Sequence, residues 1–314
     1  MEKPTFGEKL RALLATGRVA NLPTVWSNVL VAFSLSSLSI HQYRTDADTS
    51  TFWIATLVFL LISASFIYVG GCMLGDARDI HFDRLHRPNR PLPRGILSTT
   101  FVTVSAWGFL FGGLLIATTS ALLSAVIAFG IKWNELINLL SSKNGFFVIQ
   151  LHEIILASLL IACVVAYAFI HKKNKVVALT LMASCRFMLI FFAFSAAHKT
   201  FFLDSSVSRE PFFLHQNWMT SWMPLLALTV GAYTLLLSWV ASTESKSGQF
   251  QFRTILATCI LALPVVSFIL ITLLQKTPKV RNIGYLVETS FDYSQLPPSL
   301  VIHWMMLGVF VLWI

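Results

Sequence analysis

The sequence predicts an all-α polytopic membrane protein, a bundle of about eight to nine transmembrane helices, from its composition and from the recurrence of apolar runs. The chain has 314 residues, of which 56% are hydrophobic and only 12% are charged. Soluble domains carry about 25% charged residues, so this composition excludes an ordinary soluble fold. Apolar runs recur from Val19 to the end of the chain, and the mean hydropathy is +0.72.

A helix needs about 20 mostly apolar residues to cross a bilayer. Eight runs are long and apolar enough to be considered: 19–40, 52–74, 100–119, 151–171, 177–198, 219–242, 254–275 and 299–314. The third run stays apolar as far as Ile131, so residues 120–131 are open to three interpretations: a longer helix, a re-entrant piece or an additional span. Segments 133–150 and 199–218 are expected to be extramembrane insertions. We expect residues 1–314 to form a single domain, and the end at Ile314 leaves open whether a last helix is missing.

Lysine and arginine are more abundant in the segments that would share a side with the N-terminus than in the others. The positive-inside rule therefore predicts a cytoplasmic N-terminus in a plasma membrane, which we expect to be a bacterial inner membrane. This topology explains the net charge of +9 without nucleic acid as a partner. It also brings residues 75–95, the basic segment 171–175 and the loop at Glu244 to one cytoplasmic face. The four cysteines form no CxxC pair, so neither a zinc site nor a disulfide framework is indicated.

Three aspartates follow directly on the second apolar run. Asp76, Asp79 and Asp83 are spaced i, i+3 and i+7, which predicts three carboxylates on one face of a helix. Carboxylates this close repel one another unless a cation lies between them. Mg²⁺ is commonly held by one or two carboxylates together with substrate phosphates. The spacing therefore predicts catalytic, Mg²⁺-binding aspartates.

Basic residues surround the aspartates. Arginines at 84, 87, 90 and 94 are planar donors suited to phosphate, and prolines at 88, 91 and 93 end the helix. Lys172, Lys173 and Lys175 add point charges for the same anion. A diphosphate site on an apolar chain predicts a lipid diphosphate as ligand. The alternative is a solvated loop whose carboxylates are neutralised by the loop's own arginines.

The stretch Gly75–Pro93 resembles the first aspartate-rich motif of the UbiA family of intramembrane prenyltransferases, Asn-Asp-x-x-Asp-x-x-x-Asp followed by Arg-Pro-x-Arg-Pro-Leu-Pro. All three aspartates and the tail Arg87–Pro93 match, whereas Gly75 replaces the leading asparagine. Residues 18–28 resemble the entry to the family's first helix, with Arg18 and Asn28 near the mouth of the site.

The resemblance implies a helical bundle around a central cavity and Mg²⁺-dependent transfer of an isoprenyl group at the cytoplasmic side. The donor would be a prenyl diphosphate, the acceptor a small and usually aromatic molecule, and the surroundings membrane lipid. The residues implied or expected to bind substrate are Arg18, Asn28, Arg87, Arg90, Lys172, Lys173, Lys175 and Arg186. Arg186 lies about mid-span, where a charge must face a cavity or a partner, so diphosphate binding and a structural hydrogen bond are both open.

The chain departs from the family at its second aspartate motif. The corresponding segment Trp239–Lys246 contains Glu244 as its one carboxylate. The pair Cys185-Arg186 resembles family members that also carry a lone glutamate there. Glu244 either holds a second Mg²⁺ with the aspartates or leaves a site for one metal. Two further alternatives stay open: a sugar phosphate or haem acceptor, and a lipid-diphosphate binding or transport component with reduced or no transferase activity.

Overall fold

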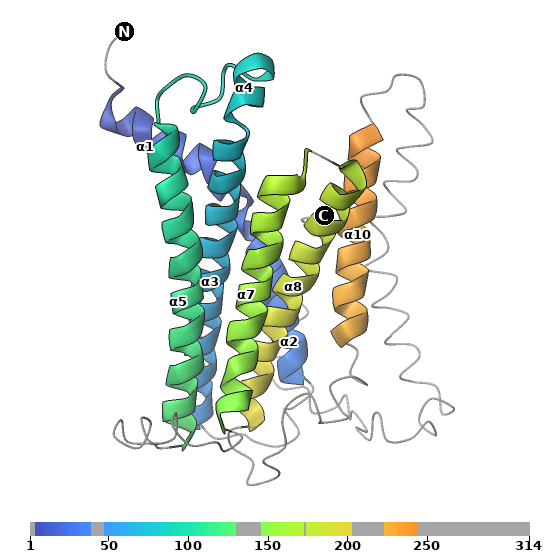
Figure 1. The fold of residues 1–314 in the computed structure, drawn as a ribbon. Helices are drawn as coiled ribbons and strands as arrows, with labels where there is room; N and C mark the ends of the chain where they lie inside the picture. The colour runs from blue at the N-terminus through green and yellow to red at the C-terminus, as the bar shows by residue number, and fades with distance from the viewer. Residues whose placement is uncertain (1–3, 39–46, 130–145, 173, 203–222, 244–314) are drawn as a thin grey trace.

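The computed structural model describes residues 4–38, 47–129, 146–172, 174–202 and 223–243. Within these ranges the regular secondary structure is helical, as predicted (Figure 1). The elements in chain order are α1 (Phe6–Thr16), the 3-10 helix η1 (Val19–Asn21), α2 (Leu22–Leu38), α3 (Ala47–Arg78), α4 (Ile80–His86), α5 (Thr99–Phe129), α7 (Phe146–Ile170), α8 (Lys175–Phe202) and α10 (Met223–Thr243).

Four of these helices contain segments long and apolar enough to cross a membrane: Ile54–Arg78, Thr99–Leu122, Glu153–Ile170 and Lys175–Ala197. A shorter apolar stretch covers Val19–Phe33. These segments identify the chain as an integral membrane protein and agree with the second to fifth predicted runs. Helix α10 corresponds to the sixth run, while the runs at 254–275 and 299–314 lie outside the described residues.

The helices extend further than the sequence predicts. Helix α5 continues to Phe129, so the longer-helix interpretation of the residues after 119 is correct up to that point. Helix α7 begins at Phe146 and α8 ends at Phe202, so the expected insertions 133–150 and 199–218 are wrong at these edges. Hydropathy marks the apolar middle of a helix, whereas backbone hydrogen bonds continue the helix into its polar ends.

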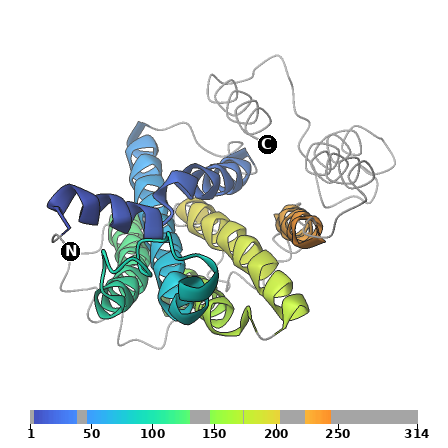
Figure 2. The same ribbon diagram turned by 90° about the horizontal axis from the view of Figure 1, so that it is seen from above.

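Helix α3 lies at the centre of the described bundle and contacts α2, α5, α7 and α8 (Figure 2). Small residues let α3 and α5 approach closely, as is common between membrane helices. A Cβ on Gly70 would lie 2.9 Å from the Ala106 carbonyl oxygen, and one on Gly113 would lie 3.1 Å from the Ser63 carbonyl oxygen. The Ser63 hydroxyl also donates a 2.8 Å hydrogen bond to the Gly113 carbonyl oxygen. This contact fixes the helix whose C-terminal end carries the aspartates.

Several polar segments gather at one end of the bundle. Helix α1 lies across α3 and α5 there, and α4 extends beyond the end of α3 (Figures 1 and 2). The loop 87–98 returns to α5 at the same end, held by the buried side chains of Leu92 and Leu97. The turn between α7 and α8 also lies at this end. The chain thus brings four separate segments to one level of the molecule.

Candidate functional site

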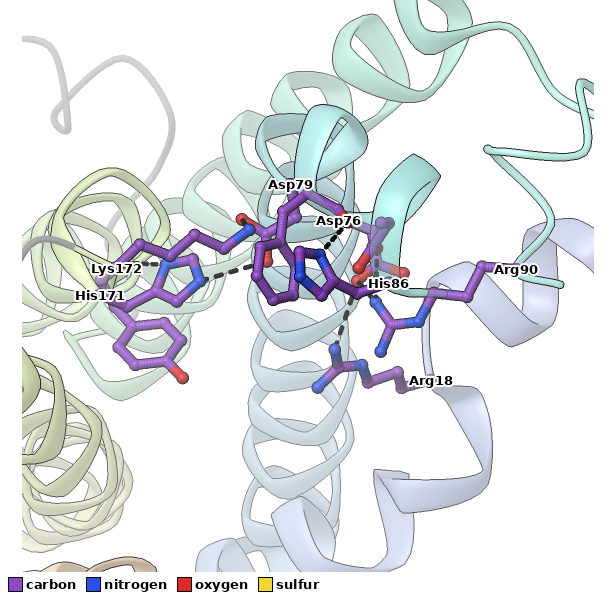
Figure 3. A network of polar contacts seen from close by, with 10 residues as sticks. Arg18, Asp76, Asp79, His86, Arg90, His171 and Lys172 are labelled. Atoms are coloured by element: carbon purple, nitrogen blue, oxygen red, sulfur yellow. Dashed lines mark hydrogen bonds and ion pairs between the residues drawn. The ribbon is translucent and has the colours of Figure 1, made fainter. Parts of the chain in front are cut away.

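The three aspartates lie at the junction of α3 and α4. Figure 3 shows Asp76 and Asp79 there. Asp76 is in the last turn of α3, Asp79 lies between the helices, and Asp83 is in α4. Backbone hydrogen bonds of 2.9 Å from the Asp79 amide to the Gly75 carbonyl and from the Asp83 amide to the Asp79 carbonyl keep the helical pattern across the break. Asp79 nevertheless lies at a turn between α3 and α4, so the three aspartates are not carried by the one continuous helix that the spacing predicted.

Asp76 and Asp83 share Arg90. The Arg90 guanidinium lies 2.8 Å from Asp83 Oδ2 and 3.3 Å from Asp76 Oδ1. The side chains of Asp76 and Asp83 are largely buried, with 9% and 2% of each residue exposed. A buried carboxylate requires a charged or hydrogen-bonding partner. Arg90 therefore acts as the counter-ion of this aspartate pair.

Arg18 adds a second cation from a distant part of the chain. Its Nη2 lies 3.3 Å from Asp76 Oδ1. Arg18 has a left-handed backbone, with φ of 48°, and it is the one non-glycine residue with positive φ in the described part of the chain. Such a conformation costs energy for a side chain other than glycine and is often found at functional sites. The backbone between α1 and η1 thus places Arg18 on Asp76.

Asp79 engages the end of α7 instead. Lys172 Nζ lies 2.8 Å from Asp79 Oδ1, and His171 Nε2 lies 3.2 Å from Asp79 Oδ2. Lys172 also lies over the Phe82 ring, 4.1 Å from its centre. This cation–π contact holds the lysine next to α4.

His171 is the first residue of the basic segment 171–175, which was predicted to add charge for the anion. Its Nδ1 lies 3.0 Å from the Tyr167 carbonyl oxygen, while its Nε2 faces Asp79. His171 thus links the end of α7 to Asp79 through both ring nitrogens. The sequence signal was a histidine directly after an apolar run.

The site joins three segments: the aspartate loop, the segment after α7 and the segment at Arg18. The first two were predicted to meet, while the third predicted segment, at Glu244, lies outside the described residues. Two of its cations, Arg18 and Lys172, come from outside the aspartate loop. The loop's own Arg90 pairs with Asp76 and Asp83, as the alternative of a self-neutralised loop expects. These two carboxylates are largely buried, however, and Arg18 and Lys172 reach the aspartates from outside the loop.

The other predicted site residues lie apart from these contacts or outside the described residues. Asn28 is buried in α2, Arg87 is exposed at the end of α4, and Lys175 is exposed at the start of α8. Lys173 and Glu244 lie outside the described residues.

Arg186 is half-buried in α8 within electrostatic range of three tyrosine and cysteine side chains on other helices. These are Tyr68 and Cys72 of α3 and Tyr233 of α10. Arg186 thus faces into the bundle, as the cost of a charge in a span requires.

The donor atoms are chemically suited to Mg²⁺. Asp83 Oδ1 is a buried side-chain oxygen for which the described structure supplies no hydrogen-bond partner. Among the described residues, no three His, Cys, Asp or Glu side chains form a complete metal site. Mg²⁺ does not require one, since it is commonly bound by one or two carboxylates completed by substrate phosphates and water. The residues at the junction therefore fit Mg²⁺ bound together with a phosphate ligand.

Comparisons with known proteins point to one group of enzymes. No family model matches the chain. A digeranylgeranylglyceryl phosphate synthase of Methanoculleus marisnigri is 35% identical over 71 residues, which is 23% of this chain and 25% of that protein. A protein of the same name from Metallosphaera sedula is 28% identical over 81 residues, 26% of this chain and 27% of that protein. The chain thus matches about a quarter of the length of these relatives.

A solved structure concerned with digeranylgeranylglyceryl phosphate synthase in membranes aligns with 84% of this chain and 78% of its own, at 17% identity and a TM-score of 0.47. The sequence matches to the two relatives, at 35% and 28% identity, are more specific than this structural similarity. The chain is thus similar over about a quarter of its length to two proteins of this name, and its aspartate motif resembles that of the UbiA family.

Proposed function

We propose that the chain is a prenyltransferase that moves an isoprenyl group from a prenyl diphosphate to a small acceptor at the α3–α4 junction. The observation that carries this proposal is the cluster of three aspartates and three basic side chains, Arg18, Arg90 and Lys172, at one end of an apolar bundle. A diphosphate group belongs at such a cluster, and its hydrocarbon tail belongs among the apolar helices.

The cations are suited to the charge that develops during transfer. The bond between C1 of the prenyl group and the diphosphate oxygen breaks, and its electron pair remains with the diphosphate. An acceptor atom then bonds to C1 and gives up its proton. Arg18 and Arg90 donate planar, charge-assisted hydrogen bonds to the departing anion, and Lys172 adds a point charge. Preorganised cations of this kind stabilise a transition state without costly reorganisation.

Mg²⁺ is the proposed cofactor. Asp76, Asp79 and Asp83 would hold it, with Glu244 as a further candidate ligand, and it would neutralise charge on the diphosphate oxygens. Because Arg90 and Lys172 contact these carboxylates in the structure, we expect the two cations to turn from the aspartates toward the anion when metal and donor bind. Asp83 Oδ1 supports this arrangement, since it is buried without a partner in the described structure.

The names of the relatives favour a glyceryl phosphate acceptor over the aromatic acceptor expected from the wider family. A phosphate-bearing acceptor needs its own cation, and Arg186 of α8 is half-buried inside the bundle. We therefore place glyceryl phosphate lipids first among the acceptors to test and aromatic acids second. We propose that the site faces the cytoplasm, which the charge bias of the loops supports.

The experiment is donor cleavage by membranes that contain the chain. Labelled prenyl diphosphates of several lengths are incubated with Mg²⁺ and each acceptor class, and released diphosphate is measured. Asp76→Asn should abolish release, whereas Glu8→Gln, which alters a carboxylate of α1 outside the cluster, should not. Binding of the donor without cleavage by the wild type would instead favour a lipid-diphosphate binding or transport component.

A further inference from the structure

Helix α1 carries an apolar stripe that the rest of the described structure leaves exposed. Phe6, Leu10 and Leu14 are 82%, 45% and 47% exposed. They are spaced by four residues, so they lie along one side of the helix. The stripe therefore differs from scattered surface leucines, because it forms a continuous apolar edge.

The stripe is not the face by which α1 packs on the bundle. Ala12 and Thr16 are buried, and Leu13 packs against the hydrophobic core. At the end of the helix, a Cβ on Gly17 would lie 3.0 Å from Val69 Cγ1 of α3. Helix α1 is thus attached to the bundle by one side and has a second apolar side that faces outward.

The position of α1 indicates what contacts that second side. The helix lies across the ends of α3 and α5, at the level of the charged junction (Figures 1 and 2). Helix α5 begins at Thr99 near this level, and its Phe101 and Val104 are exposed, as expected of a helix that faces lipid. A helix lying across the ends of membrane spans lies where the lipid headgroups begin.

The charges of α1 suit an anionic surface. Lys9 and Arg11 are exposed, and Arg94 of the neighbouring loop lies within electrostatic range of Glu8. Glu8 belongs to a capping box: its Oε2 accepts hydrogen bonds from the Thr5 amide at 2.8 Å and the Thr5 hydroxyl at 3.0 Å. These hydrogen bonds, the backbone one first, lower the pKa of Glu8 and use its carboxylate within the helix. Amphipathic helices with basic residues beside an apolar face bind anionic bilayer surfaces.

We propose that α1 is an interfacial helix that binds the anionic headgroup region of the membrane through Phe6, Leu10 and Leu14, assisted by Lys9 and Arg11. Helix α1 ends at Thr16. Arg18, which pairs with Asp76, lies only two residues further along the chain. The contact with lipid therefore also supports the segment that positions Arg18. The lipid contact is independent of the proposed function, whereas its effect on turnover rests on that function.

The test uses the full-length chain in nanodiscs that contain zwitterionic and anionic phospholipids. A photoreactive benzoylphenylalanine is placed at Leu10 or Leu14, or at Ala15 as the control, an exposed residue of the same helix outside the stripe. After irradiation, mass spectrometry identifies what is attached. We expect lipid adducts at Leu10 and Leu14 well above those at Ala15, with anionic lipid over-represented. The double substitution Lys9→Gln and Arg11→Gln should lower the anionic preference about fivefold for each charge removed while adducts persist.

Equal lipid labelling at all three positions, or a crosslink to a second copy of the chain in place of lipid, would overturn the proposal. The crosslinking readout needs no enzymatic activity, so its failure is distinct from failure of the proposed prenyl transfer. If lipid contact is found and the chain is active, Leu10→Asn together with Leu14→Asn should lower turnover. Arg18→Lys, in a chain whose α1 is unaltered, should then test separately whether the contact of Arg18 with Asp76 affects turnover.

Discussion

Lys172 Nζ lies 2.8 Å from Asp79 Oδ1, although 92 residues separate the neighbouring His171 from the same aspartate. This ion pair joins the end of α7 to the α3–α4 junction (Figure 3). Asp76 and Asp83 instead contact Arg90. The three aspartates therefore pair with different cations. The division is the structural basis for the predictions below.

Replacement of Lys172 should weaken donor binding. Lys172→Met removes the cation on Asp79 and the contact with Phe82, and charge-assisted hydrogen bonds contribute about 1.5–3 kcal/mol each. We expect the KM for prenyl diphosphate to rise about tenfold or more. Steady-state kinetics check this, with Lys172→Arg as the variant that retains the charge. An unchanged KM in Lys172→Met would exclude Lys172 from the diphosphate site.

Replacement of Arg90 should destabilise the fold in the absence of ligand. Arg90→Ala leaves the buried Asp83 carboxylate without its partner, and an unsatisfied buried group costs about 1–3 kcal/mol. Because Arg90 is 30% exposed, water would offset part of that cost. Thermal unfolding in detergent measures the effect. Arg87→Ala, an exposed residue of the same loop, should leave stability within about 0.5 kcal/mol of the wild type, and equal losses in both variants would contradict the assigned role of Arg90.

Mg²⁺ should stabilise the protein when it is added together with a prenyl diphosphate. A ligand that binds only the folded state at a hundred times its Kd adds about 2.7 kcal/mol. We expect the unfolding midpoint to rise with both additions and to fall again with EDTA. Asp83→Asn should remove most of the rise, because the buried Oδ1 loses its charge. The same rise in Asp83→Asn as in the wild type would place the metal elsewhere.

The close approach of α3 and α5 predicts opposite effects for two glycines of α5. In Gly113→Ala the new Cβ would lie 2.7 Å from Ile67 Cγ1 and 3.1 Å from the Ser63 carbonyl oxygen. Overpacking of this kind costs about 1–3 kcal/mol. A Cβ on Gly108 meets nothing within 4 Å, so Gly108→Ala should be neutral or stabilising by up to about 1 kcal/mol. The unfolding midpoint of Gly113→Ala should therefore fall, whereas that of Gly108→Ala should rise or stay unchanged.

The meeting of separate charged segments could be predicted from the sequence because topology decides it. Once apolar runs and the bias of lysine and arginine set which loops share a side, Asp79 and Lys172 are at the same end of the bundle. The helical class and the second to fifth spans could likewise be predicted, in this case from hydropathy. These properties depend on composition over about 20 residues and not on individual contacts.

The break at Asp79 and the left-handed backbone of Arg18 could not be predicted in this way. Both lie at residues that contact distant segments: Asp79 contacts Lys172 and His171, and Arg18 contacts Asp76. Helix α1 was missed because charged residues interrupt its apolar residues, so its mean hydropathy is lower than that of a membrane span. The pattern of Phe6, Leu10 and Leu14 was nevertheless visible in the sequence as an i, i+4, i+8 series.

Transfer itself is the most direct test of the central claim that the aspartate junction catalyses prenyl transfer. The purified chain in nanodiscs is given Mg²⁺, labelled prenyl diphosphates and either a glyceryl phosphate lipid or an aromatic acid, and the products are identified by mass spectrometry. We expect a prenylated acceptor and equimolar diphosphate from the wild type, with product formation lowered about 10²–10³-fold or more in Asp76→Asn. Equal product from wild type and Asp76→Asn, or intact donor bound by the wild type with every acceptor, would contradict it.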